Sequence, residues 1–273
     1  MSDNAITVAA FTLGEQACSD PDRRLPLYRC LQKVNPHLLF GYRMHGIDAR
    51  HYRVRYEMER KLGMRSWLAD GGTAVFADMD VFAPQGEGKS VADAFGPPPT
   101  AVVLQLGDAG PASTPVFAVA GLLSHASGRR SVQASHLAAY HHQMVTLPSS
   151  LDSPGSGASV GALMVGGLRI ERLPLRGAHV PSSPTAVQVV GTMPPVLDVA
   201  NLQKQLGAEA GAVLGSGPSG AATWFCSSPE LLSAWGDTEI VDTEGACPEP
   251  LLVARLHRDT LSSRLLRLAG RAA

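Results

Sequence analysis

Histidine and cysteine are the residues through which this chain could most readily bind a metal or attack a substrate, and it has nine of the former and four of the latter. His141 and His142 follow His136 by five and six positions. They therefore lie on different faces of a predicted helix and not at the i, i+4 spacing that a metal pair needs. The cysteines form no CxxC pair. We predict no metal centre and no cofactor.

Residues 50–65 form the most basic segment, with six Arg or Lys against two Glu. The charges fall all around a predicted helix and few aromatic residues lie between them, which favours solvated helix faces over a nucleic-acid stripe. The net charge of −1 supplies no cationic field across the molecule. We therefore predict that nucleic acid is not a partner.

The composition is that of a globular protein: 273 residues, 45% hydrophobic and 17% charged. No apolar run reaches the roughly 18 to 20 residues that span a bilayer. Residues 1–4 lack the basic and apolar regions of a signal peptide. We expect a cytoplasmic protein without membrane contact, and the 19 Arg against 4 Lys suggest a bacterium with a GC-rich genome.

The N-terminal third predicts alternating strands and helices. An apolar run at 6–11 indicates a buried strand, and Asp20 followed by Pro21 is typical of a helix start. Leu25, Tyr28 and Leu31 then recur at helical spacing, so a helix is expected over 21–34. Further elements are expected at 36–40 (strand), 49–62 (helix) and 72–77 (strand).

The rest of the chain predicts strands joined by turn-rich loops, with one helix at 129–147. The expected strands are 101–106, 116–123, 161–165, 187–190, 221–227, 239–241 and 251–257. The segments 84–99, 148–160 and 211–220 are rich in Gly, Pro and Ser and are interpreted as loops. Many strands with few helices and no long linker predict a single α/β (α+β) domain over 1–273, a two-layer β-sandwich flanked by helices.

This order of elements resembles the endonuclease/exonuclease/phosphatase superfamily, the DNase-I-like phosphoesterases. The likeness is clearest in the C-terminal segments 228–231, 240–243 and 252–256, and it extends to Val34-Asn35-Pro36 after the first long helix. The resemblance implies a DNase-I-like fold. It also implies Mg²⁺ held by carboxylate and amide oxygens, with a His–Asp pair that activates water.

The positions that match the family's functional motifs carry other residues in this chain. They are Thr12, Arg43, Gly121, Leu168, Ile170, Thr223, Cys247 and Glu249. Leu168 and Ile170 have no metal-binding atoms, and Arg43 places a fixed cation where a metal needs an anion. The sequence contains no Asp-x-Asn or Asp-His pair. We therefore expect no phosphodiesterase or nuclease activity by the family mechanism.

Arg43 and Glu249 are the replacements with the most chemistry. The simplest hypothesis pairs them as a buried ion pair. Such a pair could be an inert bridge, or Arg43 could bind a carboxylate or polarise a carbonyl while Glu249 acts as acid or base. Both interpretations remain open at this stage.

The other candidates would line the same cavity. Tyr42 and Trp224 could stack on a flat substrate, although core packing is the better interpretation of Trp224. His45 follows Arg43 and is the best histidine candidate for chemistry, and His125 lies on a loop that could reach the cleft; His37 is interpreted as structural.

Four further residues have weaker functional interpretations. Cys247 is expected to be a small buried hydrophobe and not a nucleophile, since no histidine lies near it in sequence. Arg169 is expected to be a surface charge at a strand end and not an anion clamp. Thr12 and Thr223 complete the set as residues that could bind a substrate.

We predict a metal-independent enzyme of specialised metabolism that cyclises, isomerises or condenses a small organic substrate in the former phosphoesterase cleft. The alternative is a pseudoenzyme that binds a ligand or a partner protein without turnover. An open cleft with converging polar groups favours the enzyme, and a filled cleft favours the pseudoenzyme. The sequence does not name the substrate or the oligomeric state.

Overall fold

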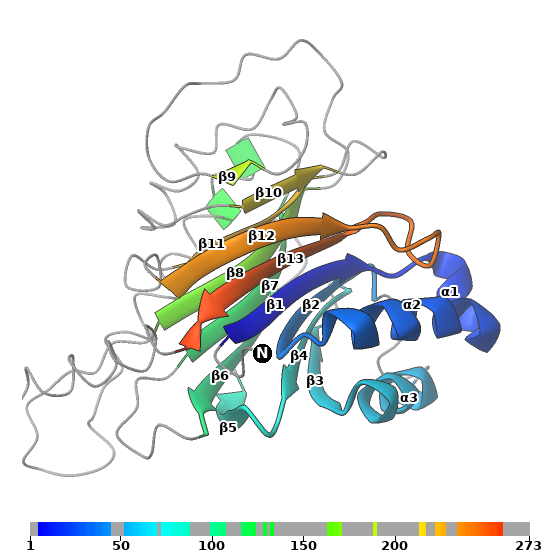
Figure 1. Cartoon of the computed structure of the whole chain (residues 1–273), viewed down its shortest axis with the longest axis horizontal. Coiled ribbons are helices and arrows are strands. Elements are labelled where there is room, and N and C mark those ends of the chain that lie inside the picture. The colour runs from blue at the N-terminus through cyan, green and yellow to red at the C-terminus, as the bar shows by residue number, and fades with distance from the viewer. Residues whose placement is uncertain are drawn as a thin grey trace, which may run out of the picture.

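The computed structural model describes residues 5–44, 52–69, 72–87, 99–107, 116–123, 128–129, 132–133, 163–170, 188–189, 213–216, 222–227 and 234–258. Two mixed β-sheets face each other, and the helices lie beside the first sheet (Figure 1). This confirms the predicted two-layer sandwich. None of the helices in these residues is long and apolar enough to cross a membrane.

The first sheet has six strands and carries the helices. Its strand order is β12 (Trp235–Val241), β13 (Leu251–His257), β1 (Ala5–Thr12), β2 (Leu38–Tyr42), β4 (Thr73–Asp78) and β3 (Met64–Ala69). The helices are α1 (Glu15–Ser19), α2 (Pro21–Val34) and α3 (Tyr52–Leu62).

The second sheet has seven strands. Its order is β5 (Phe82–Glu87), β6 (Thr100–Leu106), β7 (Val116–Leu123), β8 (Leu163–Ile170), β11 (Ala222–Ser227), β10 (Val213–Ser216) and β9 (Gln188–Val189).

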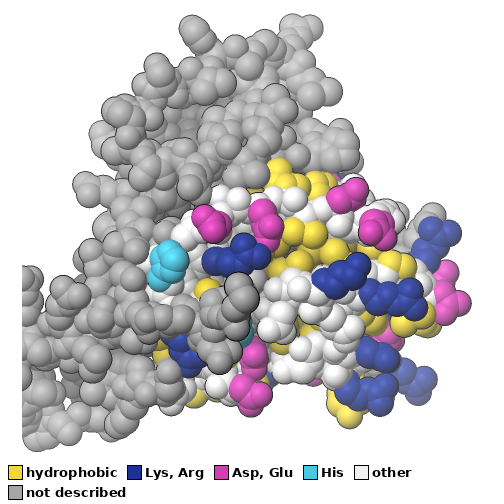
Figure 2. All heavy atoms as spheres, viewed as in Figure 1, with side chains coloured by type: hydrophobic (Ala, Val, Ile, Leu, Met, Phe, Trp, Pro, Cys, Tyr) yellow, Lys and Arg dark blue, Asp and Glu magenta, His cyan; other side chains and the backbone are white. Residues whose placement is uncertain are grey.

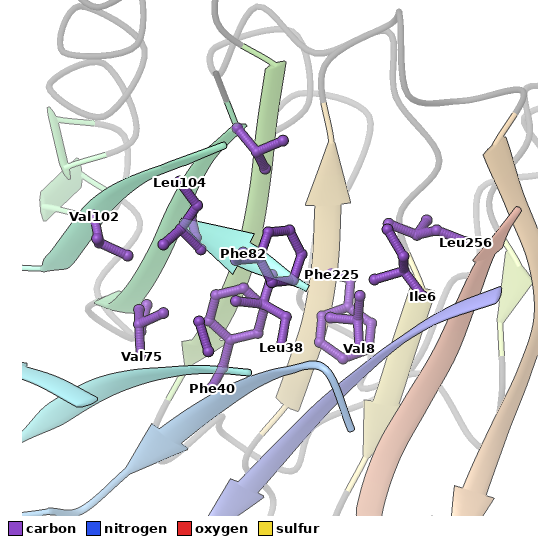
Figure 3. Close-up of a cluster of buried hydrophobic side chains, with 14 of the residues drawn as sticks. Ile6, Val8, Leu38, Phe40, Val75, Phe82, Val102, Leu104, Phe225 and Leu256 are labelled. Carbon is purple, nitrogen blue, oxygen red and sulfur yellow. The ribbon is translucent and has the colours of Figure 1, made fainter. Parts of the chain in front are cut away.

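Strand alternation divides the core into two parts. Val8 of β1 and Phe40 of β2 point into the space between the sheets, where they meet Phe225 of β11 (Figure 3). Phe11 of β1 points to the opposite face, where it shares a second cluster with Leu27 of α2. Since successive side chains on a strand point to opposite faces, the first sheet has one layer of side chains for each side.

Helix α2 has the bounds that its sequence predicted. Asp20 caps its start by accepting a hydrogen bond from the Asp22 amide, Pro21 follows, and Asn35 ends it in the left-handed conformation with φ of 50°. These local signals fix both ends of the helix, because each satisfies or removes a backbone group that the helix leaves unpaired.

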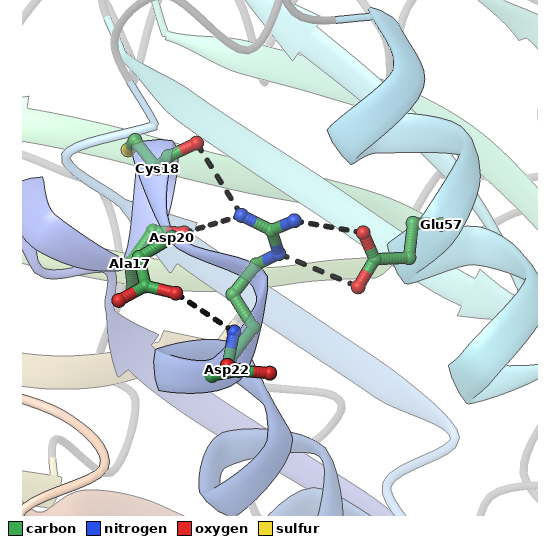
Figure 4. A network of polar contacts seen from close by, with 6 residues as sticks. Ala17, Cys18, Asp20, Asp22 and Glu57 are labelled. Atoms are coloured by element: carbon green, nitrogen blue, oxygen red, sulfur yellow. Dashed lines mark hydrogen bonds and ion pairs between the residues drawn. The ribbon is translucent and has the colours of Figure 1, made fainter.

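Arg24 links the three helices through a buried guanidinium (Figure 4). It forms an ion pair with Glu57 of α3 at 2.8 Å and donates to the Ala17 carbonyl of α1 at 2.7 Å. Arg55 and Glu59 of α3 reach Ser66 on the edge strand β3, where Arg55 donates to the Ser66 carbonyl and the Ser66 amide donates to Glu59. These bonds occupy backbone groups that an edge strand would otherwise expose.

The charges of residues 50–65 therefore have two roles. Arg53 and Arg60 are solvent-exposed, as expected. The interpretation of these charges as solvated helix faces was wrong for Arg55, Glu57 and Glu59, which bind specific partners on α2 and β3.

Three strands were not predicted. β3 follows α3 after Gly63 alone, too closely for the sequence pattern to separate them. β5 overlaps the segment 84–99 and β10 lies within 211–220, both interpreted as loops, because their Gly, Pro and Ser content concealed the strands. Of the helix expected at 129–147, only residues 129 and 132–133 belong to the described part of the chain.

Gly167 of β8 lies where the two sheets approach most tightly. A Cβ atom at this position would lie 2.6 Å from Phe40 Cγ and 2.6 Å from Tyr42 Oη, both on β2. Neither ring can move away easily, because both residues are fully buried. Only glycine fits here.

We expect Gly167→Ala to lower the free energy of unfolding by about 1–3 kcal/mol, the usual cost of overpacking a core. Gly107→Ala is the matched control, because its Cβ would lie 3.6 Å from the Val81 carbonyl oxygen, an ordinary contact. Urea denaturation of both variants measures the difference. Equal stability of the two variants would show that the sheets do not pack as described.

His37 is structural, as predicted. Its Nδ1 accepts a hydrogen bond from the Thr7 amide at 2.9 Å, at the start of the parallel pairing between β1 and β2. Burial lowers the pKa of His37; Arg258 lowers it further, and Asp78 opposes the shift. The native state therefore favours the neutral ring.

Protonation of His37 should make the protein less stable in acid. The unfolded chain binds the proton at a pKa of about 6.5 while the native state resists it, so stability rises with pH through this range. The contribution is complete above pH about 6.5 and is lost as the pH falls toward the lower native pKa. His37→Asn, whose Oδ1 can still accept from Thr7, should flatten the dependence. Urea midpoints between pH 5 and 8 measure the pH dependence of stability. If the midpoints of the two proteins change in parallel with pH, His37 is not the group responsible.

Candidate functional site

One end of the space between the sheets is closed by polar side chains. We call this set the polar end layer; it consists of Thr12, Tyr42, Thr73, Thr100, Arg169, Thr223 and Glu249. Thr12, Tyr42 and Thr73 are direct neighbours on β1, β2 and β4 of the first sheet. Arg169 and Thr223 are neighbours on β8 and β11 of the second. The layer thus spans both sheets at the ends of their strands.

An ion pair between Arg169 and Glu249 lies at the centre of this layer. Arg169 is 0% exposed and Glu249 is 6% exposed. Nη2 of Arg169 donates to Oε1 of Glu249 at 2.6 Å, and Nη1 of Arg169 donates to Oε2. The guanidinium therefore binds both carboxylate oxygens, the geometry that makes Arg–carboxylate pairs strong and specific.

Neighbouring hydroxyl groups and an aromatic ring complete the surroundings of the pair. Thr12 Oγ1 donates to Glu249 Oε2 at 3.3 Å, and Arg169 Nη1 also donates to Thr223 Oγ1 at 3.1 Å. The Arg169 guanidinium carbon lies 6.0 Å from the centre of the Tyr42 ring, within the range of a cation–π contact. Buried charges need such partners, because the interior does not solvate them as water does.

Thr73 and Thr100 extend the layer and were missed in the sequence. Their hydroxyl oxygens lie 2.8 Å apart, and Thr100 Oγ1 also donates to the Thr73 carbonyl at 2.7 Å. This joins β4 of the first sheet to β6 of the second. A threonine at a strand end is a weak signal, and only the pairing of Thr73 with Tyr42 marks it as part of the site.

The expected ion pair between Arg43 and Glu249 was wrong in one partner, since Arg169 is the guanidinium that holds Glu249. Tyr42 ends β2 and shares its inner face with Leu38 and Phe40. Arg43 lies beyond the strand, where its left-handed backbone (φ of 56°) breaks the alternation, and it lines a cavity on the helical side of the sheet. The interpretation of Arg169 as a surface charge was also wrong, because β8 points it between the sheets.

Cys247 is buried, as predicted. Burial raises the pKa of its thiol to about 12, so it is a thiol and not a thiolate at neutral pH. Its amide donates to Thr243 Oγ1 at 3.1 Å, which fixes the loop leading to Glu249.

Three other candidates cannot be placed in the site. His45 and His125 lie outside the described residues, as does the side chain of Trp224; its backbone belongs to β11.

A cavity of about 750 Å³ lies beside the polar end layer, on the helical side of the first sheet. Arg43 and Cys247 line it together with the start of α2 and residues 244–248. The predicted site residues thus divide into two groups. Thr12, Tyr42, Arg169, Thr223 and Glu249 meet between the sheets, and Arg43 and Cys247 face the cavity.

The polar end layer does not suit a divalent cation. It contains a single carboxylate, and a guanidinium already binds both of its oxygens. Mg²⁺ prefers several oxygen ligands in an octahedral arrangement. Across the described part of the chain, no three His, Cys, Asp or Glu residues lie close enough together to hold a metal ion.

Comparison with solved structures identifies the fold. The chain is similar to a humanized D. rerio TDP2 (TM-score 0.53, 10% identity, covering 92% of this chain and 98% of that one). It is similar to AP endonuclease LMAP from Leishmania major (TM-score 0.54, 10% identity, 93% and 88%) and to the human Nocturnin catalytic domain (TM-score 0.52, 11% identity, 93% and 94%). No family model and no curated protein matches the sequence.

These neighbours all have the DNase-I-like fold of the endonuclease/exonuclease/phosphatase superfamily, and this chain has the same fold. The resemblance noted in the sequence is thereby confirmed at the level of the fold. At identities of 10 to 11% the likeness extends no further than architecture.

A double-mutant cycle should show that Arg169 and Glu249 stabilise each other. We expect Arg169→Met or Glu249→Leu alone to cost about 3–5 kcal/mol of unfolding free energy, because each leaves a buried charge unpaired. The double variant should cost clearly less than the sum of the two. Urea denaturation of the four proteins measures the coupling. Arg255 and Glu239 form an exposed ion pair, so a cycle with Arg255→Met and Glu239→Leu is the control. Additive effects at 169 and 249 would contradict the pairing.

Proposed function

We propose that this protein binds a small organic ligand without a metal and does not hydrolyse phosphodiesters. The buried, bidentate Arg169–Glu249 pair at the strand ends supports the absence of a metal, and the cavity lined by Arg43 and Cys247 supports the binding of a ligand. The ion pair takes the place of a catalytic metal ion at this end of the fold.

Electrostatics support this assignment. To enter the polar end layer, a divalent cation would have to approach the positively charged guanidinium of Arg169. It would also have to take the Glu249 carboxylate away from that guanidinium, leaving one buried cation unpaired beside another. Breaking a buried ion pair in this way costs several kcal/mol before any metal ligand is gained.

The hydrogen bonding of Glu249 and the pKa of Cys247 favour ligand binding over catalytic turnover. Both oxygens of Glu249 accept hydrogen bonds from Arg169, so the carboxylate is not poised to take a proton from a substrate. The raised pKa of Cys247 keeps it from acting as a nucleophile. The pseudoenzyme is thus better supported than the cyclising, isomerising or condensing enzyme that the sequence first suggested.

The proposal predicts that divalent cations change neither activity nor stability. With bis(p-nitrophenyl) phosphate and with single-stranded DNA, we expect no hydrolysis above background in Mg²⁺ or Mn²⁺. A metal present at 100 times its Kd would raise stability by about 2.7 kcal/mol, and hence the Tm by several degrees. We expect the Tm to be the same in about 10 mM MgCl₂ and in EDTA.

An AP endonuclease of the same fold, assayed in parallel on DNA that carries an abasic site, serves as the positive control for hydrolysis. Hydrolysis that EDTA abolishes and that Glu249→Gln lowers would overturn the proposal. Metal-dependent hydrolysis that survives Glu249→Gln would equally refute it, since it would place a catalytic metal elsewhere in the chain.

A further inference from the structure

The cavity beside the polar end layer has walls from four separate segments. They are Gly14 and Ala17 in the stretch after β1, the first turns of α2, Arg43 after β2 and residues 244–248 before β13. Its volume of about 750 Å³ lies in the range of small-molecule sites. Strands β1, β2 and β13 are adjacent in the first sheet, so its topology brings these segments together.

The wall formed by residues 244–248 is held in place by its own hydrogen bonds. The Glu244 amide donates to Asp242 Oδ1 at 3.0 Å, and the Ala246 amide donates to the Thr243 carbonyl at 2.9 Å. Glu249 follows directly and is bound by Arg169 between the sheets. The cavity wall is therefore preformed, which lowers the ordering cost of binding a ligand.

Charge is distributed unevenly around the cavity. Asp22, Arg23 and Glu244 are exposed, whereas Arg43 is half-buried. Ala17 and Cys247, which also line the cavity, are buried and apolar. A guanidinium thus stands in the wall beside an apolar surface. Figure 2 shows a similar mixture on the helical side of the molecule, where hydrophobic surface lies between basic and acidic side chains.

We propose that this cavity binds a small organic monocarboxylate. This proposal rests on the ligand-binding function proposed above. The planar guanidinium of Arg43 matches a carboxylate, and the apolar body of the ligand covers Ala17 and Cys247. The two carboxylates of its lining, Asp22 and Glu244, equal its two arginines, Arg23 and Arg43, so the formal charges of the lining cancel. A lining without net positive charge disfavours the two negative charges of a phosphate monoester more than the single charge of a carboxylate.

The test uses phenylacetate as the probe, with phenylacetamide as its neutral isostere and phenyl phosphate as the dianion. Each is titrated into ¹⁵N-labelled full-length protein and followed by amide chemical shifts. We expect phenylacetate to shift resonances of residues 244–248 and of the start of α2, and to bind at least about tenfold more tightly than the other two compounds. Arg43→Gln should reduce phenylacetate binding to the level of phenylacetamide.

Arg53→Gln is the matched control, because Arg53 is an exposed arginine on α3 that does not line the cavity. It should bind phenylacetate as the unchanged protein does. A second variant, Ala246→Trp, should block the cavity; since Ala246 is only half-buried, the fold should tolerate it.

Four results would overturn the carboxylate site. They are no binding of phenylacetate up to about 10 mM, equal binding of phenylacetamide, tighter binding of phenyl phosphate, and unchanged binding by Arg43→Gln. Failure here is distinct from failure of the proposed function, because metal-dependent hydrolysis is read in a separate assay that contains no phenylacetate.

Discussion

The buried pair of Arg169 and Glu249 is the interaction on which the organisation of this molecule depends. It joins β8 of the second sheet to the segment that precedes β13 of the first. Two opposite charges in the interior are tolerated only when they bind each other and their remaining polar atoms are solvated by the protein. Thr12 and Thr223 supply hydrogen bonds for this purpose, and the Tyr42 ring lies against the guanidinium. A core of phenylalanine and aliphatic residues can therefore end in a charged layer without admitting bulk water.

The same segment connects the two parts of the site. Residues 244–248 line the cavity on the helical side, and Glu249 turns between the sheets. The first sheet separates the two, with Tyr42 on the inner side and Arg43 on the cavity side. Anchoring Glu249 thus holds the cavity wall in position, and a change at the ion pair should be felt in the cavity. We propose that the charged residues between the sheets are structural and that a ligand binds on the other side of the first sheet, in the cavity.

Local signals explain why some features could be predicted from the sequence. The ends of α2 follow from Asp20, Pro21 and Asn35, which act through backbone groups beside them. The convergence of Thr12, Thr223 and Glu249 was expected from the family resemblance. The partner of Glu249 was not, because the charge of an arginine does not reveal the face of the sheet to which it points. Thr73 and Thr100 join the site through a contact between two sheets, which no local pattern encodes.

A crystal structure of the protein grown with MnCl₂, with anomalous diffraction data, is the most direct test that the ion pair occupies the place of a metal. We expect Arg169 still to bind Glu249 through both guanidinium nitrogens. We also expect no anomalous peak within about 2.5 Å of the Glu249 carboxylate, the outer limit of a metal–oxygen bond. A manganese peak on Glu249, with Arg169 displaced from it, would contradict the central claim and return the molecule to metal-dependent chemistry.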